Sequence, residues 1–421
     1  MLANNLDLLL EVLSLLPTRS LIRFKSVCKR WQLVISDPYF IKTHRNRCNP
    51  YAMSGFRFSN QEFRHCYLLG GAHLSASAPD LSLSTLKDDA ESMRVGTPFV
   101  YCLRSFYGLL ICPLRLSRSD AICEFIYIFN PVTRQYKRIP HVDPQRYPSD
   151  IILTPDHQVI MFSRDLIHDY DADIDIRMYV PDTQSWKTLY SFRDYKKSQN
   201  CEWIFVQRNG VFLNGTVYQV MESDTIPSTF RIFPFRRKLY IFSFDLKSLS
   251  AQKLLLPHQC NDFHQENLYF GEIQGHLHLI MQQKLSNFIF HIMEIKEDFS
   301  GWNLLHCIDL INFMRDVLPP LQVFSPQKLM NSWEYPQIEY GGQNHLCALS
   351  PTHIALGERE DYELFLTVAI HTSQPYSCGS AKIFSYNIVS KTYQEILEVS
   401  DKEEYYGADN MRTYYPMLTT P

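Results

Sequence analysis

The sequence lacks the long apolar run that would mark a membrane protein. No stretch approaches the roughly 20 consecutive apolar residues that a membrane-spanning helix needs. The apolar segment at residues 6–16 is interrupted by Asp7 and Glu11, follows no basic residue and leads to no small-residue cleavage site, so it differs from a signal peptide. We therefore expect no membrane insertion and a location in the cytoplasm, the nucleus or both.

Cysteine pairing patterns are also missing. The 11 cysteines form an odd set that contains no C-x-x-C pair. Such scattered cysteines indicate reduced thiols, and they argue against a disulfide framework or a structural zinc site. This pattern is consistent with the expected cytoplasmic or nuclear location.

Local catalytic motifs are absent from the sequence. It has no G-x-S-x-G elbow, no H-E-x-x-H pair, no G-x-x-x-x-G-K phosphate loop and no G-x-G-x-x-G turn. Because catalytic triads assemble from distant positions, this absence alone is weak evidence. Nothing argues for catalysis, so we predict no catalytic residues, no cofactor and no enzyme activity in this chain.

One acidic stretch imitates a calcium-binding loop. Asp171, Asp173 and Asp175 alternate, and Asp182 stands at the twelfth position. However, Ile176 occupies the sixth position, where the sharp turn of such a loop needs glycine, and an aspartate replaces the longer bidentate glutamate. We therefore interpret the stretch as a solvated acidic loop.

The spacing of two histidines also resembles that of metal ligands. His276 and His278 alternate on an expected strand, so both side chains lie on one face and share the geometry of metal ligands. No third ligand is set by spacing. We prefer a structural or surface role for this pair and predict no metal site.

Charge is nearly balanced, which argues against nucleic acid as a partner. The net charge is −3, from 41 Lys and Arg against 44 Asp and Glu. A basic group at residues 19–30 contains a single aromatic residue, Phe24, and therefore no platform of aromatic side chains interleaved with the charges. We interpret this group as a solvated rim that faces an acidic protein partner.

The first apolar segment is too hydrophobic for an ordinary surface helix. Eight of the eleven residues at 6–16 are apolar, whereas a surface helix needs only one apolar stripe. Pro17 ends this helix, and a second helical pattern runs from Leu21 to Ile35. The sequence at 36–38 reads as a helix cap followed by proline, which predicts a third short helix. A unit of about 45 residues buries little surface, so the excess apolar face predicts a protein partner.

These residues resemble an F-box, in detail the plant version, over residues 4–44. The resemblance rests on the runs at 7–13, 16–17, 20–21, 24–25 and 27–29, on Trp31 and on Ser36-Asp37-Pro38. One departure is Asn4-Asn5, where the motif usually opens with Leu-Pro. The resemblance implies binding to a Skp-type adaptor and, through it, to a cullin scaffold of a ubiquitin ligase. The residues that it implies as adaptor contacts are Leu6, Leu8, Leu9, Val12, Leu13, Leu16, Pro17, Leu21, Phe24, Val27, Cys28, Trp31 and Ile35.

Beyond residue 48 the pattern changes to short strands. The chain has 25 Tyr and 27 Phe but only 15 Gly, and aromatic residues favour strands. Apolar residues alternate with period 2 between turn residues. The predicted fold class is therefore α+β, with a small all-α N-terminal unit followed by an all-β, propeller-like domain.

Two repeated signatures predict propeller blades. The first is a turn residue followed by a strand, at Gly108, Gly215 and Gly275, with a degenerate copy at 155–160. The second is a strand that ends in a turn, with a large aromatic residue about six positions later. The expected aromatic positions are Tyr136, Trp186 and Tyr393, with Trp302 after a small insertion. Units of 50 to 60 residues built from four short strands are typical of blades, and we expect about six.

The segments at 107–112 and 130–140 also resemble the kelch-like F-box-associated domain of plant F-box proteins. We accordingly divide the chain into an F-box at 1–48, an opening blade with a loop at 49–98 and a propeller-like domain at 99–400. Residues 401–421 are either a tail or a segment that closes the ring.

Target-binding residues are expected on loops at one face of the propeller. The candidate loops are 142–150, 164–175, 193–202, 222–236 and 331–345. Within 230–238, aromatic and basic residues mix in a way that suits an acidic or aromatic partner, although a buried strand explains the pattern equally well. The weak candidates there are Phe233, Phe235, Arg236 and Arg237.

The F-box resemblance implies that the chain is the substrate-recognition subunit of a Skp–cullin–F-box ubiquitin ligase. In this hypothesis the F-box binds the adaptor and the propeller-like domain binds an unidentified target. One alternative is a propeller enzyme or lectin whose N-terminal helices only cap the fold. Another is an adaptor-binding protein that works outside any ligase.

Overall fold

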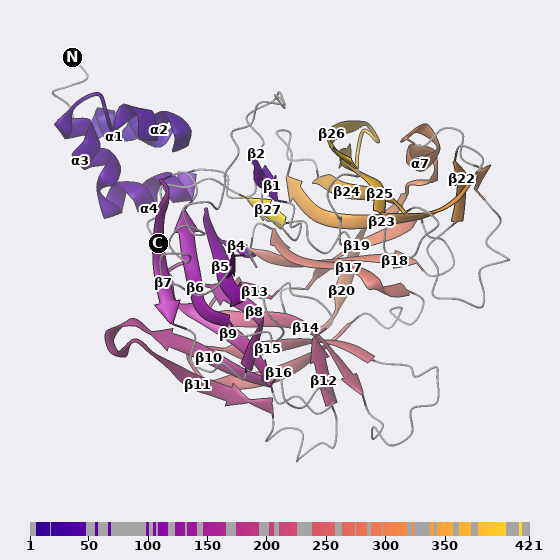
Figure 1. Ribbon diagram of the computed structural model, residues 1–421, viewed down its shortest axis with the longest axis horizontal. Coiled ribbons are helices and arrows are strands. Elements are labelled where there is room, and N and C mark those ends of the chain that lie inside the picture. Colours follow the sequence, from indigo (N-terminus) through magenta and orange to yellow (C-terminus); the bar gives the residue numbers. More distant parts are fainter. Residues whose placement is uncertain are drawn as a thin grey trace.

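We describe the fold from a computed structural model of the chain (Figure 1). The structure describes residues 6–16, 18–47, 55–57, 66–68, 98–100, 104–106, 108–116, 123–130, 133–140, 146–165, 174–192, 202–205, 210–224, 238–256, 263–273, 275–283, 288–296, 298–317, 322–323, 337–340, 343–356, 362–371, 378–400 and 412–414. Within these residues, no helix is long and apolar enough to cross a bilayer.

The N-terminal unit consists of short helices at one end of the molecule (Figure 1). They are α1 (Leu6–Ser14), α2 (Thr18–Phe24), α3 (Lys29–Ser36) and α4 (Pro38–Arg47). The sequence predicts three helices, but the pattern from Leu21 to Ile35 splits into α2 and α3. The split occurs because Cys28 adopts an extended backbone (φ −161°, ψ 163°). The Ser26 hydroxyl donates a 2.6 Å hydrogen bond to the carbonyl oxygen of Arg23, at the end of α2.

The predicted cap before the last of these helices is confirmed. The backbone N–H groups of Tyr39 and Phe40 donate to Asp37 Oδ1 at 2.8 and 3.2 Å, and Pro38 begins α4. The helices enclose one small core. Its fully buried side chains are Leu9, Leu13, Leu21, Ile35 and Phe40.

The rest of the described chain forms antiparallel sheets, as predicted, and six of them are present in these residues. We name five of them blades 1 to 5 in chain order. Blade 1 contains β3 (Pro98–Val100), β4 (Arg104–Phe106), β5 (Leu109–Leu116), β6 (Cys123–Asn130) and β7 (Gln135–Pro140). Blade 2 contains β8 (Arg146–Leu153), β9 (Val159–Asp165), β10 (Ile174–Val180) and β11 (Ser185–Ser191). Blade 3 contains β12 (Glu202–Phe205), β13 (Val211–Leu213), β14 (Thr216–Asp224), β15 (Lys238–Asp245) and β16 (Ser250–Leu255).

Blade 4 contains β17 (Phe263–Ile273), β18 (His276–Gln283), β19 (Ile289–Ile295) and β20 (Trp302–Asp309). Blade 5 contains β21 (Gln322–Val323), β22 (Gln337–Tyr340), β23 (Gln343–Leu356), β24 (Tyr362–His371), β25 (Cys378–Asn387) and β26 (Tyr393–Ser400). The sixth sheet pairs β1 (Gly55–Arg57) with β2 (Cys66–Leu68) and with β27 (Arg412–Tyr414).

Consecutive blades pack face to face, as a propeller requires. On β8, Ile151 and Leu153 pack against blade 1, whereas Ile152 between them packs against blade 3. The same alternation on β18 places Leu279 against blade 3 and Ile280 against blade 5. Each inner strand therefore buries both of its faces, because successive side chains of a strand point to opposite sides.

The first predicted signature is a turn with a left-handed residue. Gly108, Gly215 and Gly275 have φ values of 75°, 82° and 81°. His157 has a φ of 63° at the corresponding position of blade 2, which explains the degenerate copy. Glycine adopts this conformation without steric cost, whereas histidine carries some strain.

The second signature is a turn that recurs before the outer strand of every blade. In each case a residue other than glycine adopts a left-handed conformation four positions after the end of the strand that precedes the outer strand. These preceding strands are β6, β10, β15, β19 and β25, and the outer strands are β7, β11, β16, β20 and β26. The left-handed residues are Arg134, Gln184, Leu249, Phe299 and Lys391, with φ values of 59°, 48°, 55°, 56° and 58°. Asn130, Asp245 and Asn387 stabilise three of these turns by accepting backbone hydrogen bonds on their side-chain oxygens.

Blade 5 is the largest of the described blades, with six strands, and a helix precedes it. Helix α7 (Ile311–Val317) packs Phe313 and Met314 into the core between blades 4 and 5. Phe313 meets the ring of Tyr393, the predicted aromatic residue of the outer strand, at a centroid distance of 5.0 Å. Strands β21 and β22 extend the same sheet.

The C-terminal strand pairs with the first strand of the β domain. Residues 55–57 of β1 are in antiparallel register with residues 412–414 of β27. Of residues 401–421, the structure describes this strand, and the assignment of the whole segment stays a prediction. The expected opening segment at 49–98 is described at residues 55–57, 66–68 and 98.

Candidate protein-interaction surface

Helix α1 is apolar on two sides that lie about 100° apart around its axis. Leu9 and Leu13 point into the helical core and are 2% and 1% exposed. Leu8 and Val12 of α1 and Leu15 in the turn directly after it follow the spacing i, i+4, i+7, so they form a second stripe beside the buried one. They are 42%, 40% and 71% exposed. One side of this short helix already fills the core, so the exposed hydrophobic side chains on the other side indicate a surface that binds another protein.

The implied adaptor contacts divide into a supporting core and an exposed set. The supporting residues are at most 2% exposed and pack against other helices of this chain, below the exposed set. They are Leu9, Leu13, Leu21 and Ile35. Leu6, Leu8, Val12 and Val27 are between 40% and 59% exposed, and Cys28 is exposed as a free thiol. Pro17 lies outside the described residues.

The remaining implied contacts lie between these two sets. Leu16, Phe24 and Trp31 are partly buried against the helical core. The rings of Phe24 and Trp31 meet edge to face, with centroids 5.4 Å apart. This contact bridges α2 and α3 across the break at Cys28.

Three exposed apolar residues were not identified from the sequence. Leu15, Leu33 and Tyr39 are 71%, 74% and 73% exposed. For Leu15 the sequence did contain a signal. It continues the helical spacing of Leu8 and Val12, so it lies on a different side from Leu9 and Leu13, which form the core. Leu33 and Tyr39 lie within apolar runs whose buried members only the fold reveals.

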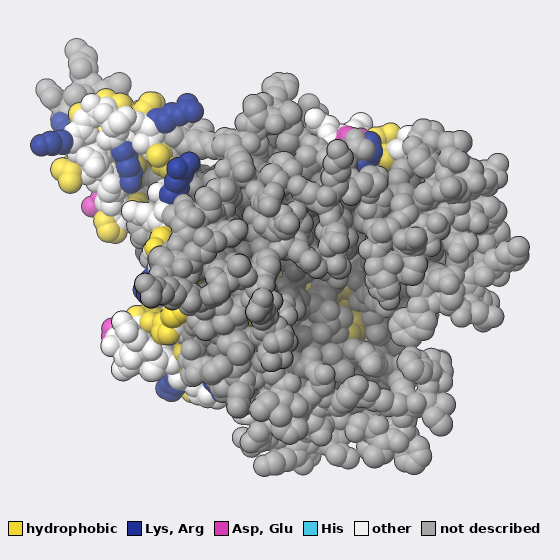
Figure 2. Space-filling view, in the orientation of Figure 1, with side chains coloured by type: hydrophobic (Ala, Val, Ile, Leu, Met, Phe, Trp, Pro, Cys, Tyr) yellow, Lys and Arg dark blue, Asp and Glu magenta, His cyan; other side chains and the backbone are white. Residues whose placement is uncertain are grey.

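Basic side chains share the helical unit with these apolar residues. Arg23 lies in the last turn of α2, and Lys29 is the first residue of α3. Figure 2 shows Lys and Arg interspersed with hydrophobic side chains over the helical unit. Partial burial lowers the pKa of Lys25, which lies between them in the chain. The helical unit therefore presents exposed apolar and basic side chains together, which favours a protein partner that offers apolar and acidic side chains.

His44 ties the last helix to the end of α1. Its Nε2 atom lies 2.9 Å from the carbonyl oxygen of Leu16, and its ring stacks on Phe40 at a centroid distance of 6.0 Å. Burial lowers the pKa of His44, although the bond to the Leu16 carbonyl raises it. The contact satisfies a carbonyl just beyond the C-terminal end of the helix, where backbone partners run out.

The weak target-binding candidates Phe233, Phe235, Arg236 and Arg237 lie outside the described residues. So do residues 193–201, 225–236 and 331–336 of the candidate loops. Of the aspartates in the imitated calcium loop, Asp182 is described as exposed in the turn after β10, and Asp175 lies on β10. It is 6% exposed and forms an ion pair with Arg177 at 3.2 Å, so its carboxylate is engaged by an arginine.

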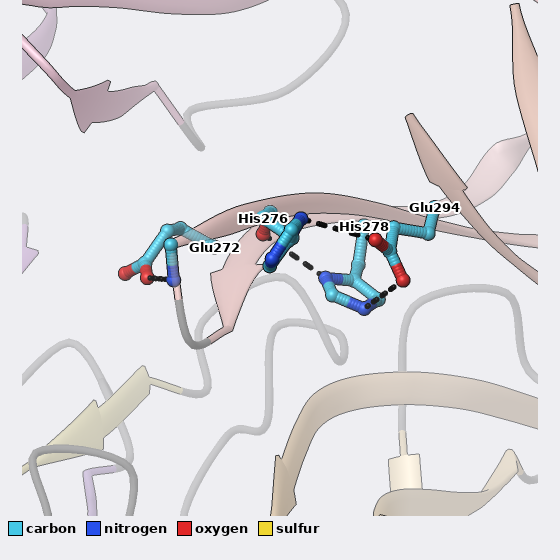
Figure 3. Close-up of polar contacts among 5 residues, drawn as sticks. Glu272, His276, His278 and Glu294 are labelled. Atoms are coloured by element: carbon cyan, nitrogen blue, oxygen red, sulfur yellow. Dashed lines mark hydrogen bonds and ion pairs between the residues drawn. The ribbon is translucent and has the colours of Figure 1, made fainter. Parts of the chain in front are cut away.

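The two strand histidines share a carboxylate. Figure 3 shows His276 and His278 of β18 turned toward Glu294 of β19. His276 Nδ1 lies 3.1 Å from one carboxylate oxygen, and His278 Nε2 lies 3.8 Å from the other. In the part of the chain that the structure describes, no group of three His, Cys, Asp or Glu side chains is placed to hold a metal ion.

Comparison with known proteins identifies both parts of the chain. Residues 5–43 match the F-box domain, and residues 103–297 match the F-box associated beta propeller domain. The second match covers blades 1 to 4 apart from strands β3 and β20, whereas blade 5 follows it.

Several Arabidopsis thaliana F-box proteins are similar to the chain. F-box protein At5g07610 is 21% identical over 93% of this chain and 85% of that protein. F-box/kelch-repeat protein At3g17570 is 28% identical over 52% of this chain and 53% of that protein. F-box protein At1g52495 is 24% identical over 58% of this chain and 54% of that protein. The second and third matches thus cover only about half of each relative.

The domain matches agree with the observed architecture of short helices followed by antiparallel blades. The chain belongs to the plant F-box proteins, in which an F-box precedes an F-box associated β-propeller domain.

Proposed function

We propose that this protein is the substrate-recognition subunit of a Skp–cullin–F-box ubiquitin ligase. The F-box binds a Skp-type adaptor, the adaptor connects it to a cullin scaffold, and the propeller-like domain holds a target protein for ubiquitination. The chain itself carries no catalytic step. It works in the cytoplasm, the nucleus or both.

The exposed stripe of Leu8, Val12 and Leu15 is the observation that carries the proposal. If the helices only capped the propeller, the second apolar side of α1 would be covered by the sheets. Instead these side chains are 40% to 71% exposed, while Leu9 and Leu13 already supply the core of the helical unit. An exposed apolar stripe on a rigid helix is the form that a docking surface takes.

The proposed mechanism is proximity. A target held on the propeller domain is tethered to the conjugating enzyme through the F-box, the adaptor and the scaffold. Tethering raises the effective concentration of target lysines beside the charged enzyme. This mechanism requires two binding surfaces on the chain and no active site.

The direct test measures binding of the purified full-length chain to a plant Skp-type adaptor by calorimetry. The variant Leu8→Glu/Val12→Glu places two charges in the stripe and leaves the buried side of α1 unchanged. Because the few hot-spot residues that dominate an interface cost about 2 kcal/mol or more when altered, and the proposal places Leu8 and Val12 among them, we expect at least about a thirtyfold loss of affinity. Leu304→Glu on β20 is the matched control, since Leu304 is a 53% exposed leucine of the β domain.

Two results would contradict the proposal. One is unchanged adaptor affinity in Leu8→Glu/Val12→Glu with the helical content preserved. The other is failure of the wild-type chain to bind the adaptor under conditions in which another F-box protein binds it. The target is then sought by proximity labelling with and without proteasome inhibition, in which true targets accumulate only when degradation is blocked.

A further inference from the structure

Titratable side chains line one end of the interface between blades 4 and 5, whereas apolar side chains line the rest. Ile280, Ile292 and Ile308 of blade 4 pack with Leu364 and Leu366 of blade 5. Toward the turn at Gly275 this apolar contact gives way to polar side chains on four strands. They are His276 and His278 on β18, Glu294 on β19, His306 on β20 and Tyr362 on β24.

His278 is buried with one ring nitrogen left without a hydrogen bond. The residue is 1% exposed, and its Nδ1 lies 3.0 Å from the carbonyl oxygen of His276. A carbonyl only accepts, so Nδ1 carries the hydrogen and Nε2 of the neutral ring is unprotonated. In the described part of the chain this Nε2 has no hydrogen-bond partner, and its 3.8 Å separation from Glu294 is too long for one.

Glu294 is the carboxylate on which both histidines converge (Figure 3). The side chain of His276 is 42% exposed and already lies 3.1 Å from Glu294 Oε1. The side chain of His278 is only 2% exposed and faces Oε2 of the same carboxylate. One carboxylate therefore stands opposite two bases, and the nearer contact belongs to the exposed one.

An aromatic ring on β24 and a glycine on β17 also stand next to His278. The ring of Tyr362 on β24 lies 6.1 Å from the ring of His278 and 5.6 Å from that of His306. On β17 the register partner of His278 is Gly271, and the phenol of Tyr269 occupies the space where a side chain at 271 would stand. Burial lowers the pKa of His278 more than Glu294 raises it.

We propose that this cluster is a proton-operated lock between blades 4 and 5. With His278 neutral, its ring packs beneath Tyr362 and the two blades stay closed at this end. A proton taken from the solvent onto Nε2 creates a buried cation beside a carboxylate already shared with His276. Its desolvation opposes the closed state, so the contact with Tyr362 loosens and β24 opens locally. This inference is independent of the proposed ligase role.

Hydrogen exchange of the full-length protein, measured by mass spectrometry, tests the lock. Protection factors for residues 362–371 are compared at pH 7.5 and 5.5 after correction for intrinsic exchange rates. We expect a several-fold loss of protection at the lower pH in the wild type and no such loss in His278→Gln. His276→Gln is the matched control, because it changes the exposed histidine on the same strand and should still lose protection. Residues 109–116 in blade 1 report any global effect.

A second variant keeps the test decisive if His278→Gln does not fold. Glu294→Gln removes the carboxylate on which the cluster converges, so acidification should cost more protection than in the wild type. Equal pH dependence in the wild type and His278→Gln, or a smaller loss in Glu294→Gln, would overturn the proposal. So would zinc ions that raise protection of residues 362–371 in the wild type at pH 7.5, because the cluster would then be a metal site.

Discussion

The indole nitrogen of Trp186 donates a 2.8 Å hydrogen bond to the carbonyl oxygen of Pro140, which lies 46 residues earlier in the chain. The bond joins the outer strand of blade 2 to the end of the outer strand of blade 1. Trp302 repeats it between blades 4 and 3, with a 3.2 Å bond to the carbonyl oxygen of Leu255, 47 residues earlier. In these two blades, the aromatic residue expected in the outer strand therefore also links neighbouring blades.

Replacing Trp186 should weaken this link. Trp186→Phe keeps an aromatic ring but removes the donor, so we expect the free energy of unfolding to fall by about 1–2 kcal/mol. Trp302→Phe should cost less, because its bond is longer and exposed to solvent. Urea denaturation of both variants measures the difference, and an unchanged free energy of unfolding in Trp186→Phe would show that the bond to Pro140 does not stabilise the contact.

The two sides of α1 should respond differently to truncation. Leu13→Ala opens a cavity beside Leu21 and Ile35, and buried leucine-to-alanine changes typically cost about 2–5 kcal/mol. Leu15→Ala removes a side chain that is 71% exposed and should change stability by less than about 0.5 kcal/mol. Hydrogen exchange of residues 6–47 in the full-length chain reports local stability. Similar losses in both variants would contradict the assignment of the two sides.

The left-handed turn positions should prefer glycine. Gly215 has a φ of 82°, and no atom lies within 4 Å of the position that a Cβ atom would take, so Gly215→Ala tests backbone strain without a clash. We expect it to destabilise the protein by about 1 kcal/mol. Leu249→Gly, at a φ of 55°, should instead be neutral or stabilising by a few tenths of a kcal/mol, because strain relief offsets the added chain entropy. Thermal unfolding of both variants checks the opposite signs.

Acidification should loosen the turn that Asp245 closes. Its carboxylate accepts hydrogen bonds from the Ser248 hydroxyl, the Ser248 backbone and the Lys247 backbone, and these bonds lower the pKa of Asp245 below its ordinary value of 3.8. A carboxyl group whose pKa is lower in the folded state stabilises the protein above the unfolded pKa and loses that effect as pH falls through the folded pKa.

Asp245→Asn provides the comparison, because blades 1 and 5 already use Asn130 and Asn387 at this position. The variant should keep the acceptor but not titrate. Its melting temperature should therefore fall less than that of the wild type as the pH is lowered from about 5 to about 3, a range that spans the ordinary pKa of an aspartate. An identical acid response would show that the Asp245 carboxylate does not contribute to this dependence.

Much of the fold is encoded in local patterns. The turns at Gly108, Gly215 and Gly275 were identifiable because few other residues adopt a positive φ without cost. The degenerate turn at His157 was identifiable only from its spacing. The split at Cys28 was missed, since apolar residues continue at helical spacing across it and the extended backbone leaves no signal in that pattern.

The interaction surface was predicted less well than the fold. The F-box resemblance assigned Leu9 and Leu8 the same role, yet one is buried and the other is exposed. Leu15 was not selected at all. Leu9 and Leu8 differ by about 100° around one helix, and only the position of the neighbouring helices decides which of them meets the core.

The sequence by itself determined that α1 has apolar residues all around it, and that strands with period 2 recur in units of similar length along the chain. These properties depend on residue type and spacing. Only the tertiary structure decided that Leu13 packs against the helical core while Leu8, Val12 and Leu15 are exposed. It alone joined Trp186 to Pro140 and brought His278 beneath Tyr362. Burial and long-range contacts depend on how distant elements pack, and a local pattern contains no record of that packing.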